Sequence, residues 1–429
     1  MSEAEEKDLP PDHYAVFRLR DFRLYLTGRL FAVIGQQMLT VAVGWELYER
    51  THSPLALGLV GLAEMIAMVC CTLPAGHLAD NLNRKRIILT ALLVSSSASL
   101  GLALISWQHA PVGWIYACLF TTCAARTFLW PASSAFLTSL VPRKLFPRAV
   151  TWNSGAFQLS SVAGPALGGV LIAVLHKFSD HPAAFIYLLN FCTAATCFLC
   201  VKAVRAHHVV KNPEPMSLKS LATGFHFIFS QRLILGMITL DMFAVFLGGA
   251  TALLPVYAKD ILHSGADGLG LMQAALPLGS VACALYLAHR APMQKAGRAL
   301  LWCVAVFGLA TIGFGFSQWF WVSFAMLFIC GAVDNVSVVV RHTSVQLLTP
   351  DDKRGRVSAV NSLFIGTSNE LGGFRSGIVA WLFTTPTVLG NAHATGAIMS
   401  TVSGGIGTIL VVLAVAWIWP QIRKYGKLA

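Results

Sequence analysis

Apolar segments about as long as a membrane is thick recur along the entire chain, and only short polar connections separate most of them. A helix of roughly 20 apolar residues is needed to cross the hydrocarbon core of a bilayer. Charged residues make up 12% of the chain, about half of the ~25% that soluble domains carry. The mean hydropathy is +0.66. These features predict an all-α membrane protein with many spans and argue against a soluble globular domain.

We expect twelve membrane-spanning helices and one long internal connection. The helices are expected at residues 24–48, 55–79, 87–107, 112–140, 150–175, 183–203, 233–256, 267–289, 299–316, 319–347, 357–384 and 396–420. The connection contains the helix-breaking run Pro213-Glu214-Pro215, followed by an amphipathic surface helix at 217–231. The expected parts are a tail (1–23), a six-helix bundle (24–203), the connection (204–232), a second bundle (233–420) and a second tail (421–429). Residues 1–12 are acidic and polar, unlike a cleavable signal peptide.

The two halves of the chain carry a repeated segment. The run LVPRKLFPRAVTWNS at 140–154 aligns without a gap with LTPDDKRGRVSAVNS at 348–362, a constant offset of 208 residues. Leu, Pro, Arg, Asn and Ser match, and both segments join the fourth and fifth expected helices of their half. We interpret this as a duplication that produced two parallel six-helix repeats.

Basic residues are concentrated in alternate connections and in the two tails. Of the 31 Lys and Arg residues, the exceptions are Arg50, Lys177 and Lys259 in the opposite connections and Arg29, Arg126, Arg341 and Arg375 within spans. This asymmetry follows the positive-inside rule, so both tails are expected to be cytoplasmic. The net charge of +12 is therefore explained by membrane topology, and no nucleic-acid partner is expected.

Four short runs connect the chain to a known family. The run GHLADNLNRKR at 76–86 resembles the loop between the second and third helices of major facilitator superfamily transporters. The runs WELY at 45–48 and THSPLALGLVG at 51–61 resemble the branch that contains the enterobactin exporter and macrolide efflux proteins. The run AGPALGG at 163–169 resembles the core of a motif associated with antiporters. Asn81, Asn83 and Ser160 depart from these patterns.

The resemblance implies two pseudo-symmetric six-helix bundles that work by alternating access. It also implies that the first and fourth helices of each half line a central cavity. Asp80 is then expected to accept a hydrogen bond from Arg84 and to face the N-terminus of the eleventh helix while the cytoplasmic side is closed. Gly76, with Gly164 and Pro165, completes this expected conformational gate. The glycines also have a simpler interpretation as sites of close helix packing.

Eight ionisable residues are expected within spans, where each costs roughly 2.5–3.5 kcal/mol at the centre of a helix. They are Arg29, Glu64, Arg126, Asp241, Asp334, Arg341, Glu370 and Arg375. Arg126 and Asp334 differ by the repeat offset, so pseudo-symmetry predicts that they face each other across the cavity. They would form an ion pair, or Arg126 would hold an anionic group of the cargo while Asp334 carries a proton.

The other embedded charges leave more than one interpretation open. Asp334 and Arg341 share a helix face and would interact through an intermediate group. Glu370 and Arg375 should point in different directions and pair with other helices, and Asp241 and Glu370 either couple to protons or form structural pairs. Glu64 is expected to pack structurally. Arg29 and Arg341 either extend to the cytoplasmic surface or take part in function.

Other chemistries find little support in the sequence. There is no phosphate-binding loop and no nucleophile turn, so an enzyme is not expected, nor is a cofactor. The pair Cys197 and Cys200 has a metal-type spacing but lacks nearby His or acidic ligands, so we expect it to pack. Phe128, Trp130, Phe157 and Phe246 are candidates for an apolar cavity lining.

The sequence thus predicts a secondary transporter for an amphipathic small molecule such as a drug, a siderophore or another secondary metabolite. Proton-coupled export is the expected mode. A lipid or lysolipid transporter, a uniporter, and a non-transporting membrane sensor are the alternatives. The expected partners are the cargo, protons and membrane lipids, the expected state is a monomer, and the expected location is a bacterial inner membrane.

Overall fold

The computed structural model describes residues 14–205, 225–290, 293–350, 353–384 and 392–426, and these residues are almost entirely helical. The first half contains η1 (Ala15–Arg18), α1 (Arg20–Thr51), α2 (Pro54–Asn81), α3 (Arg84–Trp107), α4 (Gly113–Leu140), η2 (Arg143–Leu145), α5 (Phe146–Leu175) and α6 (Pro182–Ala203). The second half contains α8 (Arg232–Gly248), η3 (Ala250–Leu253), α9 (Leu254–Val256), η4 (Tyr257–Ile261), α10 (Gly265–Ala288), α11 (Ala296–Phe316), α12 (Phe320–Leu348), α13 (Arg354–Leu382), α14 (Ala392–Ile418) and α15 (Pro420–Lys424).

Long apolar helices dominate this architecture. Within the described residues, 10 helices are long and apolar enough to cross a membrane. The long helices α4 and α13 fall outside that set, and they carry Arg126 and the pair Glu370 and Arg375. The helix bounds agree with the sequence-based expectation to within a few residues. The chain is therefore an integral multi-pass membrane protein, as predicted.

The seventh span differs from the expectation of one continuous helix over 233–256. It ends as α8 at Gly248 and continues through η3, α9 and the π-helix η4. Gly249 has a non-helical backbone, and a Cβ atom there would lie 2.5 Å from the carbonyl of Gly372 in α13. The close approach of α13 therefore requires glycine at the position where α8 ends.

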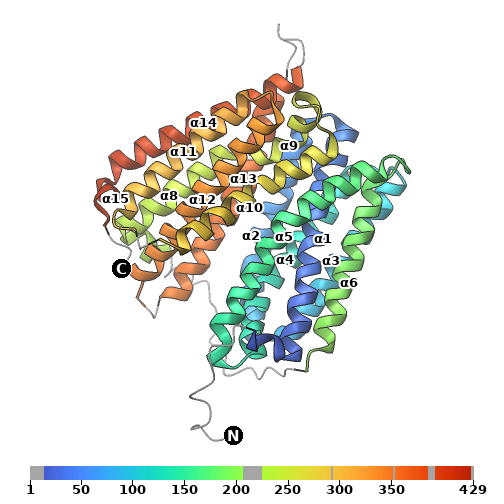
Figure 1. Ribbon diagram of the computed structural model, residues 1–429, viewed down its shortest axis with the longest axis horizontal. Coiled ribbons are helices and arrows are strands. Elements are labelled where there is room, and N and C mark those ends of the chain that lie inside the picture. Colours follow the sequence, from blue (N-terminus) through green and yellow to red (C-terminus); the bar gives the residue numbers. More distant parts are fainter. Residues whose placement is uncertain (1–13, 206–224, 291–292, 351–352, 385–391, 427–429) are drawn as a thin grey trace, which may run out of the picture.

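The two halves form two bundles of similar construction (Figure 1). The fourth helix of each half ends at Leu140 and Leu348, and the fifth begins at Phe146 and Arg354. Both pairs of positions keep the sequence offset of 208 residues. The structural boundaries thus follow the repeat that the sequence indicated.

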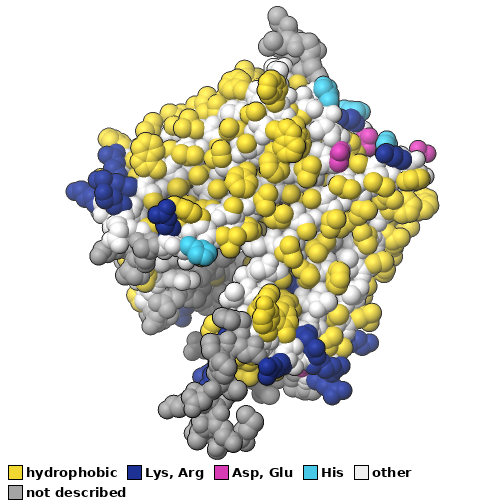
Figure 2. Space-filling model, in the orientation of Figure 1, with side chains coloured by type: hydrophobic (Ala, Val, Ile, Leu, Met, Phe, Trp, Pro, Cys, Tyr) yellow, Lys and Arg dark blue, Asp and Glu magenta, His cyan; other side chains and the backbone are white. Residues whose placement is uncertain are grey.

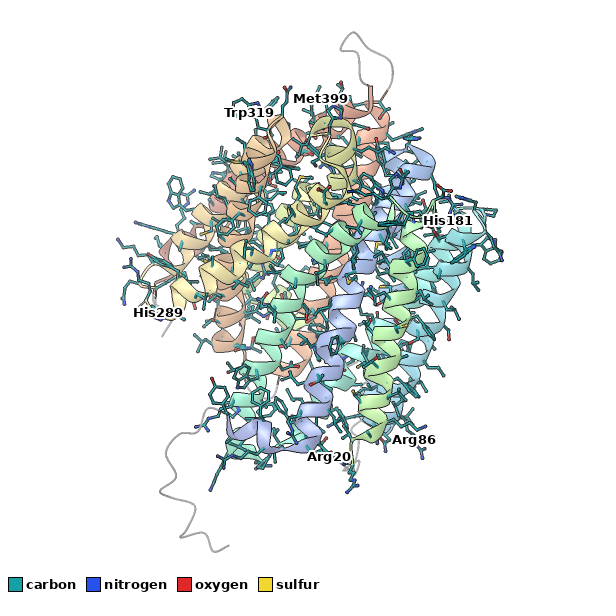
Figure 3. The ribbon with its side chains drawn as sticks, turned by 45° about the vertical axis from the view of Figure 1, so that its right-hand side comes forward. Arg20, Arg86, His181, His289, Trp319 and Met399 are labelled. Carbon is teal, nitrogen blue, oxygen red and sulfur yellow. The ribbon has the colours of Figure 1, made fainter. Side chains whose placement is uncertain are left out.

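Apolar side chains cover most of the visible surface, while Lys and Arg gather toward its lower and left margins (Figure 2). Arg20 and Arg86 lie at one end of the first bundle and His181 lies at the opposite end (Figure 3). We call the end with Arg20 and Arg86 the basic end, and the end with His181 and Trp319 the far end. An apolar belt between two polar ends is the surface that a bilayer requires.

The bundles meet through two pairs of helices near the far end. Helix α5 crosses α10 where a Cβ atom on Gly169 would lie 2.4 Å from the carbonyl oxygen of Ala266. Helix α2 crosses α13 where a Cβ atom on Gly377 would lie 2.5 Å from the Cα atom of Gly58. The helix backbones are therefore in direct contact at both crossings. Toward the basic end the ribbons of the two bundles diverge (Figure 1).

Polar contacts also join the two bundles at the far end. The Tyr48 hydroxyl of α1 donates a hydrogen bond to Asp260 of η4. The Lys259 ammonium lies 3.7 Å from Glu49 and 5.9 Å from the centre of the Trp45 ring. These contacts tie the end of α1 to the irregular part of the seventh span, so the bundles are joined by both backbone packing and ion pairing.

The predicted surface helix at 217–231 lies partly outside the described residues. Residues 225–230 are helical, and Phe227 and Ile228 pack with residues of α8, α12 and α13. The described part of the segment is therefore packed against the second bundle.

Candidate functional site

Six of the eight embedded charges form two groups, and each group contains two carboxylates and one guanidinium. The central cluster consists of Glu64, Arg126 and Glu370 from α2, α4 and α13. The second cluster, within the second bundle, consists of Asp241 from α8 and Asp334 and Arg341 from α12. In each group two carboxylates accompany a single guanidinium, so the ionised group carries one excess negative charge.

The central cluster connects the two bundles. Arg126 Nη2 lies 3.0 Å from Glu64 Oε2, and 43% of the Arg126 side chain is exposed. Glu370 interacts electrostatically with both of these residues. A Cβ atom on Gly61, one turn before Glu64, would lie 2.4 Å from the backbone oxygen of Glu370. The carboxylate of Glu370 is thus brought to the ion pair by the close crossing of α2 and α13.

The predicted ion pair between Arg126 and Asp334 is not formed in this structure. Arg126 takes Glu64 of its own bundle as its partner, because α2 packs directly against α4. The expectation that Glu64 only packs missed this role. The charge balance contained the signal, since Glu64 is the one acid among the three ionisable residues that were expected within the spans of the first half.

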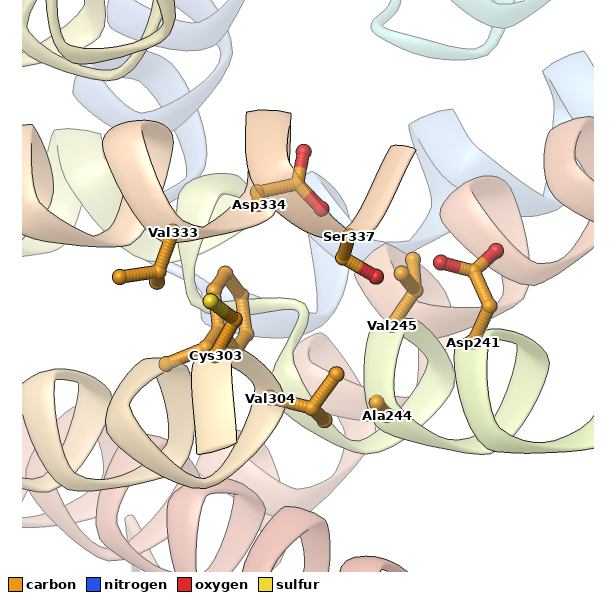
Figure 4. Close-up of a pocket in the computed structure, with 9 residues that line it drawn as sticks. Asp241, Ala244, Val245, Cys303, Val304, Val333, Asp334 and Ser337 are labelled. Carbon is orange, nitrogen blue, oxygen red and sulfur yellow. The ribbon is translucent and has the colours of Figure 1, made fainter. Parts of the chain in front are cut away.

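The two acids of the second cluster line a small, partly open cavity. Asp241 forms an ion pair with Arg341, whose side chain is only 2% exposed. Asp334 forms no hydrogen bond or ion pair with any residue that the structure describes. Asp241 and Asp334 line a cavity of about 20 Å³ together with Ser337 and apolar side chains from α8, α11 and α12 (Figure 4). That volume is enough for about one water molecule.

Arg29 and Arg341, for which extension to the cytoplasmic surface was one expectation, instead contact other side chains within the protein. Arg341 is fully buried and pairs with Asp241, so it does not extend to the membrane surface. Asp334 interacts electrostatically with both Asp241 and Arg341. Arg29 donates from Nη1 to the Tyr25 hydroxyl at 2.9 Å, and its guanidinium lies 5.9 Å from the centre of the Trp130 ring. Both side chains therefore contact neighbouring helices.

Arg375 points away from Glu370, as the sequence spacing predicted, but its partners are neutral. Its Nη1 donates to the backbone oxygens of Leu247 at 2.8 Å and Ser400 at 3.3 Å, and its Nη2 donates to Ser403 Oγ at 3.1 Å. Leu247 lies at the end of α8, where carbonyl groups lose their helical partners. Arg375 thus supplies donors where the seventh span is broken.

Replacing Arg375 with Ala should lower the free energy of unfolding by roughly 1–3 kcal/mol, because it removes the donor from the Leu247 carbonyl inside the bundle. The expected measurement is a lower Tm of the purified protein in detergent. Arg375→Lys, which keeps a charged donor but loses the fork, should give an intermediate value. An unchanged Tm for Arg375→Ala would contradict this role.

The structure describes only some side chains of the predicted conformational gate. The side chain of Asp80 lies outside the described residues. Its contacts with Arg84 and with α13, the eleventh expected span, therefore remain a prediction. Arg84 Nη1 donates to the backbone oxygen of Ala135 in α4 at 3.1 Å. Lys85 donates to the backbone oxygens of Lys202 and Val204 at the end of α6, where a positive charge is favourable.

Two of the other gate residues, Gly164 and Pro165, take part in helix packing. Gly76 is half-buried in α2. A Cβ atom on Gly164 would lie 2.5 Å from Gln37 Cβ in α1, and the backbone oxygen of Pro165 approaches Gly270 of α10. This geometry supports the interpretation of Gly164 as a close-packing position.

The aromatic residues that were candidates for an apolar cavity lining lie in different environments. Trp130 is 62% exposed, and its ring lies 6.1 Å from that of Phe157 in an edge arrangement. Phe128 instead packs against the apolar core of the first bundle. Phe246 lies beside the crossing of α8 and α13, where its backbone approaches Gly372.

Cys197 and Cys200 pack closely against α1. A Cβ atom on Gly28 would lie 2.9 Å from Cys200 Cβ and 3.1 Å from the Cα atom of Cys197. This contact agrees with the packing role expected for the pair.

Comparisons with known proteins agree with this architecture. The family model of the Major Facilitator Superfamily matches residues 25–373. The enterobactin exporter EntS of Citrobacter koseri is 26% identical over 413 residues, covering 95% of this chain and 93% of that protein. EntS of Shigella flexneri is 25% identical over 415 residues, with the same coverage.

Solved structures show the same fold at low sequence identity. A bacterial homologue of the human lysosomal transporter Spinster, in an inward-facing and unoccupied conformation, has a TM-score of 0.70 at 14% identity, covering 97% of this chain and 98% of that chain. The nucleoside transporter NupG has a TM-score of 0.71 at 14% identity, with coverage of 95% and 99%. Because the family model spans most of the sequence, the chain belongs to the Major Facilitator Superfamily and is a secondary transporter rather than an enzyme.

Proposed function

We propose that this protein exports an amphipathic small molecule in exchange for protons, with its basic end in the cytoplasm. The concentration of Lys and Arg at that end supports the orientation, through the positive-inside rule. The full-length similarity to enterobactin exporters supports export over uptake and makes enterobactin the first cargo to test.

Proton coupling is supported by the carboxylate of Asp334, which has no hydrogen-bond or ion-pair partner among the described residues. It lies inside the second bundle beside a cavity with room for a water molecule, and the nearby guanidinium of Arg341 is engaged by Asp241. An unpaired carboxylate in an apolar interior is costly unless it binds a proton or a cation. Asp334 would therefore take up a proton when this cavity is closed and release it when water gains access.

The contacts between the bundles suggest which stage of the cycle the structure represents. The glycine crossings and the contacts of Tyr48 and Lys259 close the far end, which would face the periplasm. Cargo would then enter from the cytoplasm and bind between the bundles near Arg126. Rocking of one bundle against the other would move access to the periplasmic side.

Transport into everted membrane vesicles tests this function. The vesicles carry the cytoplasmic face outward, so an acidic lumen should drive accumulation of enterobactin in vesicles that contain the protein. Addition of enterobactin should also dissipate part of the pH gradient, as reported by a pH-sensitive dye. Vesicles from cells without the protein provide the control.

The alternative functions give different results in the same assay. Entry of enterobactin that reaches only equilibrium and ignores the pH gradient would identify a uniporter. Movement of lysolipid in the absence of enterobactin transport would identify a lipid transporter. Either outcome would overturn proton-coupled export.

A further inference from the structure

An aromatic side chain projects from the first bundle beside the central cluster. Trp130 lies one helical turn after Arg126 on α4, so the two side chains share a face and are separated by roughly 6 Å along the helix. Arg126 pairs with Glu64 and interacts with Glu370 of the opposite bundle. The face that carries Arg126 and Trp130 is therefore directed toward the second bundle.

The Trp130 ring is held from two sides. The Arg29 guanidinium of α1 lies 5.9 Å from the ring centre, and the Phe157 ring of α5 meets it at 81°. Arg29 is fixed in turn by Tyr25, whose hydroxyl donates to the backbone oxygen of Ser133 at 3.3 Å. A ring that is 62% exposed is thus oriented before any cargo arrives.

This position differs from that of a tryptophan in the membrane interface. Interfacial tryptophans lie near the ends of spans, whereas Trp130 lies well inside α4. Two guanidinium groups close to the ring would also be costly if this face were in contact with lipid. The exposed ring therefore belongs to the interior space between the bundles.

Arg126 leaves donors available beside this ring. Its Nη2 contacts Glu64 and Cys123, while Nε and Nη1 have no acceptor among the residues that the structure describes. A guanidinium presents its donors in a planar fork that matches the two oxygens of a carboxylate. Stacking on Trp130 and bonding to Arg126 are possible for one molecule, since the two groups are a helical turn apart.

Building on the proposed transport function, we propose that Arg29, Arg126, Trp130 and Phe157 form a subsite for an aromatic ring that bears an acidic substituent. The ring would stack on the exposed part of Trp130, with Phe157 at its edge. The acidic group would bind the free donors of Arg126. Arg29 draws electron density from the Trp130 ring, which favours electron-rich aryl groups over saturated rings.

Calorimetric titration of the purified full-length protein with three matched compounds tests the subsite. The compounds are 2-naphthoate, its saturated analogue decahydro-2-naphthoate, and the neutral 2-naphthamide. Naphthoate should bind about three- to tenfold more tightly than the saturated acid, as expected for one aromatic contact. It should also bind more tightly than the amide, which lacks the charge that Arg126 would recognise.

Variants of the protein test which residues produce these two binding preferences. Trp130→Ala should remove the preference for naphthoate over the saturated acid, and Trp130→Phe should retain part of it. Arg126→Lys keeps the charge but not the fork, so it should reduce the preference for naphthoate over the amide. Trp321→Phe, at an exposed tryptophan near the far end of α12, should change neither ratio.

Equal affinities for the aromatic and saturated acids in the wild type, or no binding of naphthoate, would overturn the subsite. An unchanged preference in Trp130→Ala would also overturn it. These results are separable from the transport function itself. Gradient-driven uptake of enterobactin without an aryl preference removes only the subsite, whereas an aryl preference without such uptake removes the proposed function.

Discussion

Replacing Asp334 with Asn should reduce enterobactin uptake driven by a pH gradient to the level of vesicles that lack the protein. The amide has nearly the same shape as the acid but cannot bind and release a proton. Because Asp334 has no ion-pair partner among the described residues, the substitution should leave the packing and the Tm unchanged. The expected measurement is initial uptake into everted vesicles with an imposed pH gradient.

Counterflow separates coupling from binding in this variant. Exchange of labelled for unlabelled enterobactin needs no net proton movement, so Asp334→Asn should retain it. Asp180→Asn changes an exposed acid in the connection before α6 and should transport like the wild type. Full gradient-driven uptake by a folded Asp334→Asn protein would remove Asp334 as the coupling site.

Adding one methyl group at the bundle crossings should shift the protein away from the conformation described here. The Cβ atom of Gly169→Ala or Gly377→Ala would overlap backbone atoms at 2.4 and 2.5 Å, and a backbone cannot move aside as a flexible side chain can. Overpacking of this kind typically costs about 1–3 kcal/mol. Since it acts only where the far end is closed, the population of that state should fall by about 5- to 150-fold.

Distances between labels at the far end report this shift. Spin labels at the exposed positions 177 and 263, placed in a cysteine-free background, span α5 and α10 near their crossing. Their separation should increase in both glycine variants, and transport should decrease. Gly155→Ala provides the matched control, because a Cβ atom there would meet nothing within 4 Å. Unchanged distances in Gly169→Ala and Gly377→Ala would show that these crossings do not determine the state.

The two acids of the second cluster are expected to differ in how much their neutralisation destabilises the protein. Removing the charge of Asp241 would leave the buried guanidinium of Arg341 without its counter-ion, which is strongly destabilising. Removing the charge of Asp334 breaks no ion pair in the part of the chain that the structure describes. The same residue type thus has a structural role in α8 and a proposed coupling role in α12.

The sequence by itself determined the number and order of the spans, the duplication, and the end at which basic residues gather. Each of these depends on hydropathy or charge along a continuous segment, or on alignment of the chain with itself. The helix ends at Leu140 and Leu348 keep the repeat offset for that reason. Family membership also follows from short local motifs such as the one at 76–86.

Only the tertiary structure decided which embedded charges meet. Glu64 pairs with Arg126, Asp241 pairs with Arg341, and Arg375 binds the carbonyls at the break in the seventh span. Spacing gives the direction of a side chain around its own helix, but the partner depends on the rotation and tilt of a neighbouring helix. Those quantities are set by close contacts such as Gly61 against the backbone of Glu370 and Gly249 against that of Gly372, which join segments far apart in the sequence.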